Sequence, residues 1–388
     1  MIDRKTKNAE IFRDTEQRYT SDSTLMQAIQ QSTQAQVFIA ETDSIVIPSA
    51  YKSEKAKVVV SGKRSLEAAE AYAKQGKKVC VLNFASATNP GGGVVNGSSA
   101  QEECICRCTT LYPCLNTDAM WNVFYKPHRK AANPLYNNDC IYTPDVCVFK
   151  SDTNFPEPLP IEDWWNVNIL TCAAPNLRER PSNAMNPHAG DKAAKITPAE
   201  LENLLTTRIQ RIFEIAAANR NEVLILGAFG CGAFRIPPEI VAKVFNMVMQ
   251  DYLCCFDTIE YAVYHTEREL ANYEAFKRIP SVIMTKTYNK LVRDRIPEII
   301  GASGKSCKTE ILSNEEYLEM LDAKLDEELA EYHKDQNLEE LADLLEVIRA
   351  AAVARGYTFE ELEAVRARKA EKRGGFEKKI LLIEVEEK

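Results

Sequence analysis

Two adjacent glutamates, Glu102 and Glu103, are the strongest candidates for acid–base chemistry in the sequence. They follow three consecutive glycines in the stretch 89–103, NPGGGVVNGSSAQEE. Glycine permits positive φ and a close approach of backbone to a ligand, and N–H groups at a strand-to-helix turn bind anions. Successive helical residues point about 100° apart, so we expect only one carboxylate to face the glycines. The glycine run alone is equally consistent with a tight turn.

A second glycine-rich stretch, residues 227–235 (GAFGCGAFR), follows an apolar run and precedes an expected helix. It lacks the GK[ST] of a P-loop and does not open a βαβ unit with GxGxxG spacing. Two glycine loops at the ends of two strands suit a ligand that carries a diphosphate and two sugars. We therefore expect an anionic ligand to lie between the two loops.

A group of carboxylates farther along the chain has the spacing of a metal site. Glu327, Glu328 and Glu331 fall on one expected helix, and Glu340 and Asp343 fall on the next. Residues three or four apart share a helix face, and an antiparallel hairpin would bring both sets together. Carboxylates crowded in this way repel unless a hard cation such as Mg²⁺, which prefers oxygen ligands, lies among them. A solvated acidic face is the alternative interpretation.

The elements that must position the two glycine loops alternate between strand and helix. Strands are expected at 57–60, 78–84, 166–172, 222–226 and 259–264, and helices at 65–75, 99–115, 198–219 and 237–253. This alternation predicts a mostly parallel sheet that is covered on both faces. Ligands of such folds bind at the carboxyl ends of the strands, which is where both glycine loops fall.

The carboxylate group belongs to a different, helical part of the chain. Apolar residues at helical spacing predict helices at 314–332 and 338–353, and the short turn between them predicts a hairpin. From residue 286 onward the net charge is -6, whereas it is -2 before that point, and eleven of the twelve cysteines lie in the earlier part. We therefore expect a domain at 1–280, a linker at 281–286 and a second domain at 287–388.

Composition excludes several classes of protein. Of the 388 residues 45% are hydrophobic and 27% charged, as in a folded globular chain. No apolar run approaches the ~18 residues that span a bilayer, and the charged N-terminus predicts no secretory signal. A net charge of -8 argues against a surface that coats duplex nucleic acid. The cysteines are expected to be reduced thiols of a cytoplasmic protein.

The clustered cysteines and the histidines do not predict a metal site. Cys104, Cys106, Cys108 and Cys114 have C-x-C-x-C-x5-C spacing rather than the C-x2-C pairs of a zinc site. Buried thiols that act as small apolar side chains are the favoured interpretation. The four histidines do not pair at ligand spacing, and the sequence has no nucleophile elbow for a Ser-His-Asp hydrolase.

Residues 83–103, NFASATNPGGGVVNGSSAQEE, resemble the signature of bacterial-type poly(ADP-ribose) glycohydrolases, which are divergent macrodomains. The 227–235 loop resembles their diphosphate-binding loop, except that Ile236 stands where asparagine is expected. The resemblance extends to about residue 280. It implies an α/β macrodomain-like three-layer sandwich with a mixed sheet, and hydrolysis of ribose–ribose O-glycosidic bonds in poly(ADP-ribose) or an ADP-ribosylated protein without a cofactor.

Carried over residue by residue, the resemblance makes Glu103 the catalytic carboxyl group and Glu102 the group that binds and orients the ribose. Asn89 would contact a ribose hydroxyl, and Phe234 would pack on the distal ribose. The remaining residues expected to contact ADP-ribose are Gly91, Gly92, Gly93, Val94, Gly230, Cys231, Gly232 and Ala233. A module that only binds ADP-ribose, or a mono-ADP-ribosyl hydrolase, stays open as the alternative; a pure binder needs no catalytic carboxylate.

The helical part resembles the all-alpha nucleotide pyrophosphohydrolases, which include MazG-like and phosphoribosyl-ATP pyrophosphohydrolase-like proteins. The matching stretches are 287–300 (TYNKLVRDRIPEII), the EELAE and EELAD helices, and 369–376 (KAEKRGGF). The resemblance implies an all-α helical-hairpin bundle that releases pyrophosphate from a nucleotide with Mg²⁺.

The residues implied for this second site fall into two sets. The metal ligands would be Glu328, Glu331, Glu340 and Asp343, and the phosphate-binding residues Lys290, Arg293, Lys372 and Arg373. Apolar stripes on such hairpins usually need a partner, so we expect a homodimer through this domain. A degenerate dimerisation or regulatory module is the alternative.

Overall fold

The computed structural model describes residues 3–47, 54–182, 187–266, 270–279, 288–302 and 307–385. The chain divides into two compact units, Met1–Met284 and Thr285–Lys388, which are described separately below. The expected linker 281–286 lies outside the described residues. Among the helices that the structure describes, none is long and apolar enough to cross a membrane.

The N-terminal unit is built on a seven-stranded sheet with the order β1-β4-β5-β3-β6-β7-β2. The strands are β1 (Val37–Ile39), β2 (Lys57–Ser61), β3 (Val79–Phe84), β4 (Cys140–Val148), β5 (Trp165–Cys172), β6 (Val223–Leu226) and β7 (Thr258–Ala262). The five strands from β5 to β2 are mutually parallel. At the other edge β4 runs antiparallel to β5, and β1 antiparallel to β4. The sheet is therefore mixed, as the resemblance implied.

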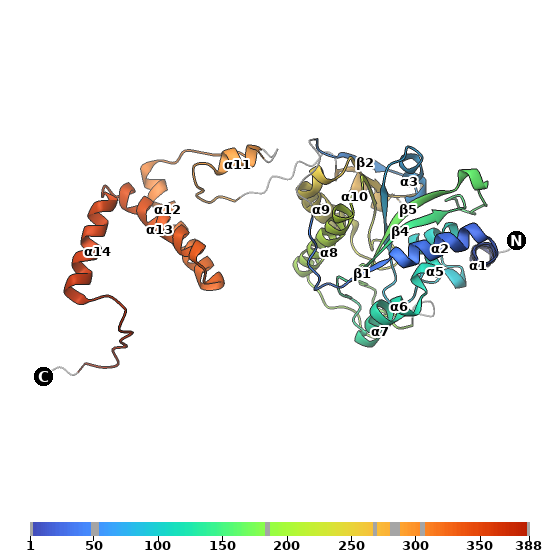
Figure 1. Cartoon of the computed structure of the whole chain (residues 1–388), viewed down its shortest axis with the longest axis horizontal. Helices are drawn as coiled ribbons and strands as arrows, with labels where there is room; N and C mark the ends of the chain where they lie inside the picture. Colours follow the sequence, from blue (N-terminus) through green and yellow to red (C-terminus); the bar gives the residue numbers. More distant parts are fainter. Residues whose placement is uncertain are drawn as a thin grey trace. The chain divides into compact units, whose positions relative to one another are not determined.

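Helices cover both faces of this sheet (Figure 1). The helices are α1 (Arg4–Ser21), α2 (Ser23–Ala35), α3 (Ser65–Ala73), α4 (Gln101–Cys108), α5 (Leu111–Leu115), α6 (Asp118–Met120), α7 (Lys126–Ala131), α8 (Pro198–Ala218), α9 (Pro238–Met249) and α10 (Ala271–Lys277). Cys80 and Leu82 of β3 pack with α8 and α9, whereas Val79 and Val81 pack with α1, α3 and α4. Alternate residues of a strand point to opposite faces, so β3 is buried between two helical layers.

The expected helix at 99–115 is interrupted, and that prediction is wrong in its extent. The α-helix α4 ends at Cys108, and Thr109 takes an extended conformation with φ of −138°. Thr109 forms an antiparallel bridge with Val148 of β4, after which α5 begins at Leu111. Pairing with a strand distant in sequence breaks the helix here. The expected helix at 237–253 likewise ends as an α-helix at Met249 and continues as the 3₁₀ segment Gln250–Cys255.

The thiols in this unit act as core residues. None of the twelve cysteines, all of which lie within the described residues, forms a disulfide. Cys106, Cys108 and Cys114 of the clustered set are completely buried. Their interpretation as small apolar side chains agrees with their positions.

The C-terminal unit contains α11 (Ile296–Ala302), α12 (Asn314–Asp335), α13 (Leu338–Ala354) and α14 (Phe359–Arg373). Ser313 and Thr358 begin α12 and α14 with capping boxes, and Gln336 ends α12 in the left-handed conformation. The guanidinium of Arg355, the residue that caps the end of α13, bonds to Asp322 in the first half of α12 at 2.7 Å. The two helices are therefore antiparallel, while their assembly into a bundle stays a prediction.

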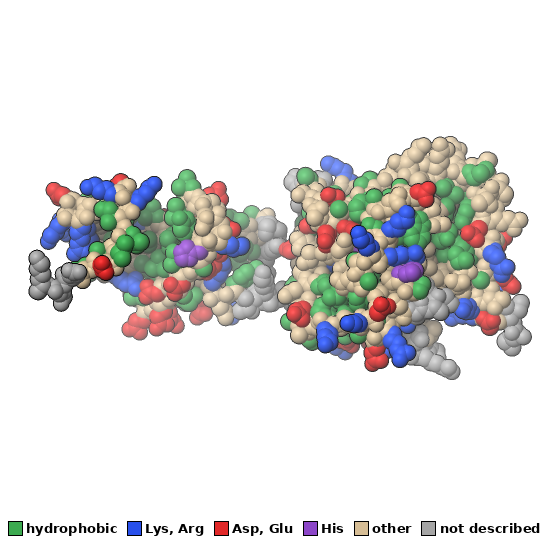
Figure 2. Space-filling view, turned by 90° about the horizontal axis from the view of Figure 1, so that it is seen from below, with side chains coloured by type: hydrophobic (Ala, Val, Ile, Leu, Met, Phe, Trp, Pro, Cys, Tyr) green, Lys and Arg blue, Asp and Glu red, His purple; other side chains and the backbone are tan. Residues whose placement is uncertain are grey.

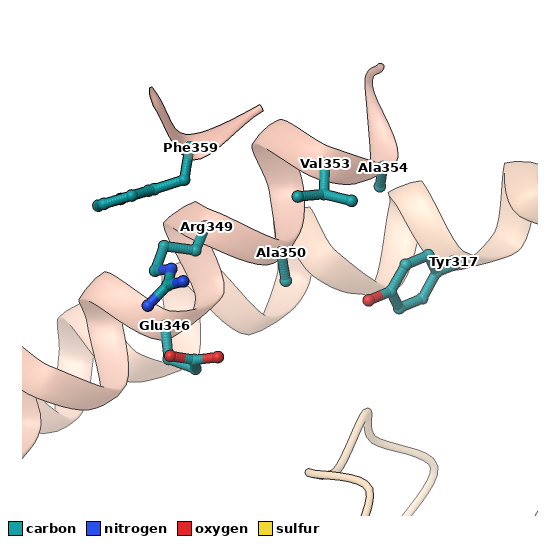
Figure 3. Close-up of a pocket in the computed structure, with 7 residues that line it drawn as sticks. All are labelled: Tyr317, Glu346, Arg349, Ala350, Val353, Ala354 and Phe359. Atoms are coloured by element: carbon teal, nitrogen blue, oxygen red, sulfur yellow. The ribbon is translucent and has the colours of Figure 1, made fainter. Parts of the chain in front are cut away.

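A groove of 280 Å³ opens where the three longer helices of this unit meet (Figure 3). Tyr317 of α12 and Phe359 of α14 lie on either side of α13, which contributes Arg349 and Val353. The Arg349 guanidinium carbon lies 4.5 Å from the centroid of the Phe359 ring. This contact holds the start of α14 against α13.

Candidate functional site

The two glycine loops meet because their strands are neighbours. β3 pairs in parallel with β5 on one side and with β6 on the other. The carboxyl ends of these strands therefore lie at one edge of the sheet. The first glycine loop follows β3 and the second follows β6, so the structure brings together the two motifs that the sequence singled out.

The first glycine loop allows no side chain at Gly92. Its φ is +59°, and a Cβ placed there would lie 2.6 Å from Glu103 Oε1 and 3.1 Å from Glu102 Oε2. Both carboxylates thus approach the same glycine, and the expectation that only one could face the loop is wrong. Long side chains on a helix lean toward its N-terminus, which turns both glutamates back over the loop.

Glu103 is buried with one oxygen bonded and the other without a partner. The Gly93 N–H donates to Oε1 at 2.9 Å. Within the described residues, Oε2 is buried and accepts no hydrogen bond. Burial raises the pKa of this carboxyl group, against the opposing effect of the Gly93 N–H. A buried carboxyl group with a raised pKa stays protonated to a higher pH and is therefore suited to act as a general acid.

Glu102 lies deeper, at 2% exposure. The Ser86 N–H donates to its Oε2 at 2.7 Å, and the Asn83 amide lies 3.4 Å from its Oε1. Burial, and after it the negative charge of Glu103, raise the pKa of Glu102 well above its ordinary value. The two groups therefore form a pair in which both negative charges are disfavoured.

Gln101 fixes the start of α4 to β3 and was not assigned a role from sequence. Its Oε1 accepts the Phe84 N–H at 2.9 Å, and its Nε2 donates to Leu82 O at 2.8 Å. A third bond, from Nε2 to Ser65 Oγ at 3.0 Å, ties it to α3. The amide thus satisfies the backbone at the end of β3 and sets the position of the two glutamates that follow. Its place before the glutamate pair was the only signal in the sequence.

Asn89 stands at the entrance of the first glycine loop. Its side-chain Oδ1 accepts a hydrogen bond from the guanidinium of Arg129, and its backbone oxygen accepts the Gly92 N–H at 3.0 Å. Val94, at the other end of the triplet, is completely buried and packs in the core beside α4. The structure therefore places Asn89 at the site, whereas the Val94 side chain lies beneath it.

The second glycine loop is shaped by contacts beneath it. Gly230 has φ of +75°, and a Cβ there would lie 2.5 Å from Ile236 Cδ1 and 2.7 Å from Ala174 Cβ. Ile236 is buried, so this departure from the family pattern fills the space under Gly230. The Cys231 N–H donates to Ala228 O at 3.1 Å and is used within the turn.

The tip of the second loop presents donors outward. Gly232 and Ala233 are exposed, and within the described residues the N–H groups of Gly232, Ala233 and Phe234 donate to no protein acceptor. The Phe234 ring lies 6.2 Å from the Tyr136 ring and packs on Ala87 and Ala173. These features suit phosphate oxygens at the tip and a sugar against Phe234.

Arg208 is a completely buried cation behind the site that sequence reasoning missed. It donates to Ala173 O at 2.9 Å, to Tyr136 O at 3.3 Å and to Asn138 Oδ1 at 2.9 Å. No carboxylate in the described part of the chain bonds to it, and burial lowers its pKa. Its acceptor Ala173 packs with Phe234 and precedes Ala174, whose Cβ would lie 2.7 Å from a Cβ placed at Gly230, so the guanidinium lies behind residues that border the second glycine loop.

In the C-terminal unit three of the four expected metal ligands lie together. Glu328, Glu340 and Asp343 each place an oxygen within 4.8 Å of the others. Glu331 is not a member of this group, although its charge acts on Glu340. Loss of solvent and the charge of Glu331 raise the pKa of Glu340. Acidic side chains gather along one side of this unit in Figure 2.

Two of the basic residues expected to bind phosphate form ion pairs at this end of the unit, one with Asp343 of the acidic group and one with Glu327, which precedes Glu328. Lys290 bonds to Glu327 at 2.7 Å, and Arg293 bonds to Asp343. Lys324, which the sequence did not suggest, bonds to Glu328 at 2.6 Å. Lys372 and Arg373 lie exposed in the last turn of α14, and no ion pair joins them to the acidic group within the described residues.

Comparisons with known proteins show which proteins the N-terminal unit resembles. Residues 8–151, which include the first glycine loop and both glutamates, match the family model described as microbial-type PARG, catalytic domain. The structure is similar to poly(ADP-ribose) glycohydrolase from Thermomonospora curvata, with 26% identity, a TM-score of 0.60, and coverage of 70% of this chain and 98% of that one. The prediction of a macrodomain-like α/β fold with a mixed sheet is confirmed.

Two further proteins are similar to parts of this chain. Poly(ADP-ribose) glycohydrolase from Deinococcus radiodurans in complex with ADP-ribose is 26% identical with a TM-score of 0.53, over 65% of this chain and 96% of that one. An uncharacterized protein of Mycolicibacterium smegmatis is 62% identical over 42 residues, which are 11% of this chain. The match spans 43% of that relative.

Proposed function

We propose that the N-terminal unit hydrolyses the ribose–ribose O-glycosidic bonds of poly(ADP-ribose) and releases ADP-ribose. The observation that supports this most directly is Glu103, a buried carboxyl group of raised pKa held by the Gly93 N–H against the glycine loop. A module that only binds ADP-ribose gains nothing from such a carboxyl group, because burying it costs free energy. The structural similarity to glycohydrolases points the same way.

In this proposal Glu103 acts as the general acid. It protonates the leaving ribose oxygen as the glycosidic bond breaks and an oxocarbenium-like centre forms; water then attacks that centre and gives a proton back to the Glu103 carboxylate. Glu102, fixed by the Ser86 N–H, binds a ribose hydroxyl and orients the sugar. The N–H groups at the tip of the second loop hold the diphosphate, and Phe234 packs against the distal ribose. The bound diphosphate helps to position the attacking water.

The test compares cleavage with binding. Wild type and Glu103→Gln are assayed for release of ADP-ribose from poly(ADP-ribose), and for ADP-ribose binding by calorimetry. Loss of release with binding retained is expected. Equal rates of ADP-ribose release by the two proteins would show that Glu103 is not the catalytic acid. A parallel assay on mono-ADP-ribosylated protein separates polymer hydrolysis from mono-ADP-ribosyl hydrolysis.

For the C-terminal unit we propose a second activity, Mg²⁺-dependent release of pyrophosphate from a nucleotide. Its support is the convergence of Glu328, Glu340 and Asp343 from two helices. The buried Oε2 of Glu328 has no hydrogen-bond partner within the described residues, so this three-carboxylate set fits a hard cation. These residues would hold the ion, which would supply an activated water and neutralise phosphate charge. Lys290 and Arg293 lie beside the carboxylates and would exchange these partners for substrate phosphate.

The second activity is tested on a panel of nucleoside triphosphates with Mg²⁺, with the Glu340→Gln/Asp343→Asn variant as control. Turnover by the wild type alone is expected. Absence of turnover on every nucleotide would favour a regulatory or dimerisation module instead.

We also propose that the C-terminal unit forms a homodimer in the cytoplasm. Leu341, Leu345 and Ile348 lie at helical spacing on α13 and are 43%, 51% and 38% exposed. An exposed apolar stripe of this kind favours a partner surface. Light scattering of the full chain and of Leu345→Glu tests the proposal; a monomeric wild type would overturn it.

A further inference from the structure

Arg129 contacts the entrance of the first glycine loop from a segment that belongs to neither loop. It lies in α7, and its Nε donates to Thr88 O at 2.7 Å. Its Nη2 donates to Asn89 Oδ1. We infer that Arg129 is a positioning residue, which acts through Asn89 to set how the site receives a ribose; this inference rests on the proposed function.

The geometry suits a guanidinium in particular. A planar guanidinium presents several N–H groups in a fixed fork, whereas a lysine ammonium is a flexible point charge. Arg129 uses this fork to bond the backbone of one residue and the side chain of the next. The backbone oxygen of Asn89 accepts the Gly92 N–H at 3.0 Å, and this hydrogen bond forms the start of the glycine turn. Arg129 therefore fixes both the path of the chain into the loop and the side chain at its start.

Trp121 supports Arg129 from the other side. The guanidinium carbon lies 4.5 Å from the centroid of the Trp121 ring. The ring itself is held by a hydrogen bond from Trp121 Nε1 to Asn116 Oδ1 at 2.8 Å. Stacking on an aromatic face is favourable for a guanidinium and limits its rotation. The stack keeps the fork aimed at Thr88 and Asn89.

The contact also sets the orientation of the Asn89 amide. An asparagine has an acceptor oxygen and a donor nitrogen at opposite sides of its amide. Because Oδ1 accepts from Arg129, Nδ2 is turned to the opposite side. The Arg129 contact therefore determines which group of the Asn89 amide lies on the side away from α7.

The test is a double-mutant cycle read out by ADP-ribose binding to the full chain. The proteins are wild type, Arg129→Ala, Asn89→Ala and the double variant, with Lys130→Ala on the exposed side of α7 as control. Arg129→Ala is expected to weaken binding about tenfold, as for loss of a charge-assisted hydrogen bond. In the Asn89→Ala background the same change should cost about twofold or less, because coupled residues are not additive. Lys130→Ala should bind as wild type does.

Two further measurements keep the inference separate from a general loss of structure. Arg129→Lys retains the charge but not the fork, so its affinity should stay close to that of Arg129→Ala. KM for poly(ADP-ribose) should rise more than kcat falls. Three results would each overturn the role of Arg129 and leave the proposed function standing: wild-type affinity in Arg129→Ala, full additivity in the cycle, or rescue of affinity by lysine. Failure of the wild type to bind ADP-ribose would overturn the proposed function and this inference with it.

Discussion

The backbone N–H of Gly93 donates a 2.9 Å hydrogen bond to Oε1 of Glu103. The same glycine loop thus carries the backbone that approaches the ligand and the donor that orients the acid. Since Oε1 accepts from the backbone, the proton of the neutral carboxyl group belongs on Oε2, which is the buried oxygen without a partner within the described residues. The loop therefore determines which oxygen can give a proton to a substrate.

Glu103→Gln tests this arrangement directly. Glutamine keeps an oxygen for the Gly93 N–H but cannot donate an acidic proton, so the rate of ADP-ribose release should fall by about 100-fold or more. Binding of ADP-ribose, measured by calorimetry, should change by less than about threefold. In the wild type, whose pKa at Glu103 is raised, activity should decline as pH rises through that pKa because the acid form is lost. The assignment would be contradicted if Glu103→Gln released ADP-ribose as fast as the wild type and its activity declined in the same way at alkaline pH.

Glu102→Gln is expected to stabilise the N-terminal unit at neutral pH. The folded pKa of Glu102 lies well above the ordinary 4.5, so the folded chain binds more protons than the unfolded chain between those two values. Stability therefore falls as pH rises through this window. Removing the charge should raise the free energy of unfolding at pH 7 by roughly 1–3 kcal/mol and flatten its dependence on pH.

Tryptophan fluorescence during urea unfolding reports the free energy of unfolding of the N-terminal unit. The chain has three tryptophans, at positions 121, 164 and 165, all in the N-terminal unit. Glu162→Gln, at an exposed position of the same unit, serves as the matched control. If the free energy of unfolding of Glu102→Gln depended on pH as that of the wild type does, the Glu102 carboxyl group would not be the source of the pH dependence.

Gly92→Ala should strongly lower the rate of ADP-ribose release while the rest of the N-terminal unit stays folded. The added methyl group would lie 2.6 Å from Glu103 Oε1, on a backbone whose φ of +59° already disfavours a side chain. Displacement of the catalytic carboxyl group should lower the rate about 100-fold, since small misplacements of reacting groups are costly. Gly301→Ala is the control, because a Cβ there meets nothing within 4 Å. Normal activity in Gly92→Ala would show that the loop can open around the methyl group.

Arg208→Met should weaken ADP-ribose binding, whereas Arg211→Met should not. Both arginines lie on α8 and are buried, and both donate to backbone oxygens. Only Arg208 bonds to residues around the site; Arg211 bonds to Ala40 and Asp43. Loss of the buried positive charge is expected to raise the dissociation constant about threefold to tenfold. Equal affinities in the two variants, with similar thermal midpoints, would contradict an electrostatic role.

Mg²⁺ binding to the C-terminal unit should strengthen as pH rises. The pKa of Glu340 is raised by loss of solvent and by neighbouring carboxylates, and a metal ligand must lose its proton to bind. Calorimetric titration of the full chain should give tighter binding at pH 8 than at pH 5. The Glu340→Gln/Asp343→Asn variant should show no such binding. Binding that is independent of pH, or retained in the variant, would place the ion elsewhere.

Much of the catalytic loop could be predicted from sequence because its signals are local. The glycine triplet, Glu102 and Glu103 lie within a few residues of each other, and strand and helix patterns flank them. Gln101, Arg129 and Arg208 were missed because their partners are distant: Arg208, for example, bonds to Ala173 and Tyr136. No spacing in the sequence connects such residues.

The two strands of the antiparallel edge, β1 and β4, were missed for a different reason. β4 contains Pro144 and a residue of positive φ, Asp145, and its register shifts between Thr143 and Val146. A proline and a bulge break the alternating pattern that identifies a strand. β1 has three residues, too few for any periodicity. In the C-terminal unit, the ion pairs of Lys290 with Glu327 and of Arg293 with Asp343 were missed because each joins residues far apart in the sequence.

The two glycine loops differ in how firmly they are held, and this affects turnover. The first leaves β3, a strand bonded on both sides, and returns to the sheet through the Gln101 amide. The second also leaves a strand bonded on both sides, β6, but its tip is exposed at Gly232 and Ala233, whose N–H groups donate to no protein acceptor within the described residues. Movement of the first loop would strain the Gln101 hydrogen bonds to β3, whereas the exposed tip of the second loop can shift without breaking a hydrogen bond from its own N–H groups within the described residues. Product release is therefore expected to begin at the phosphate end, with the acid staying in place between cycles.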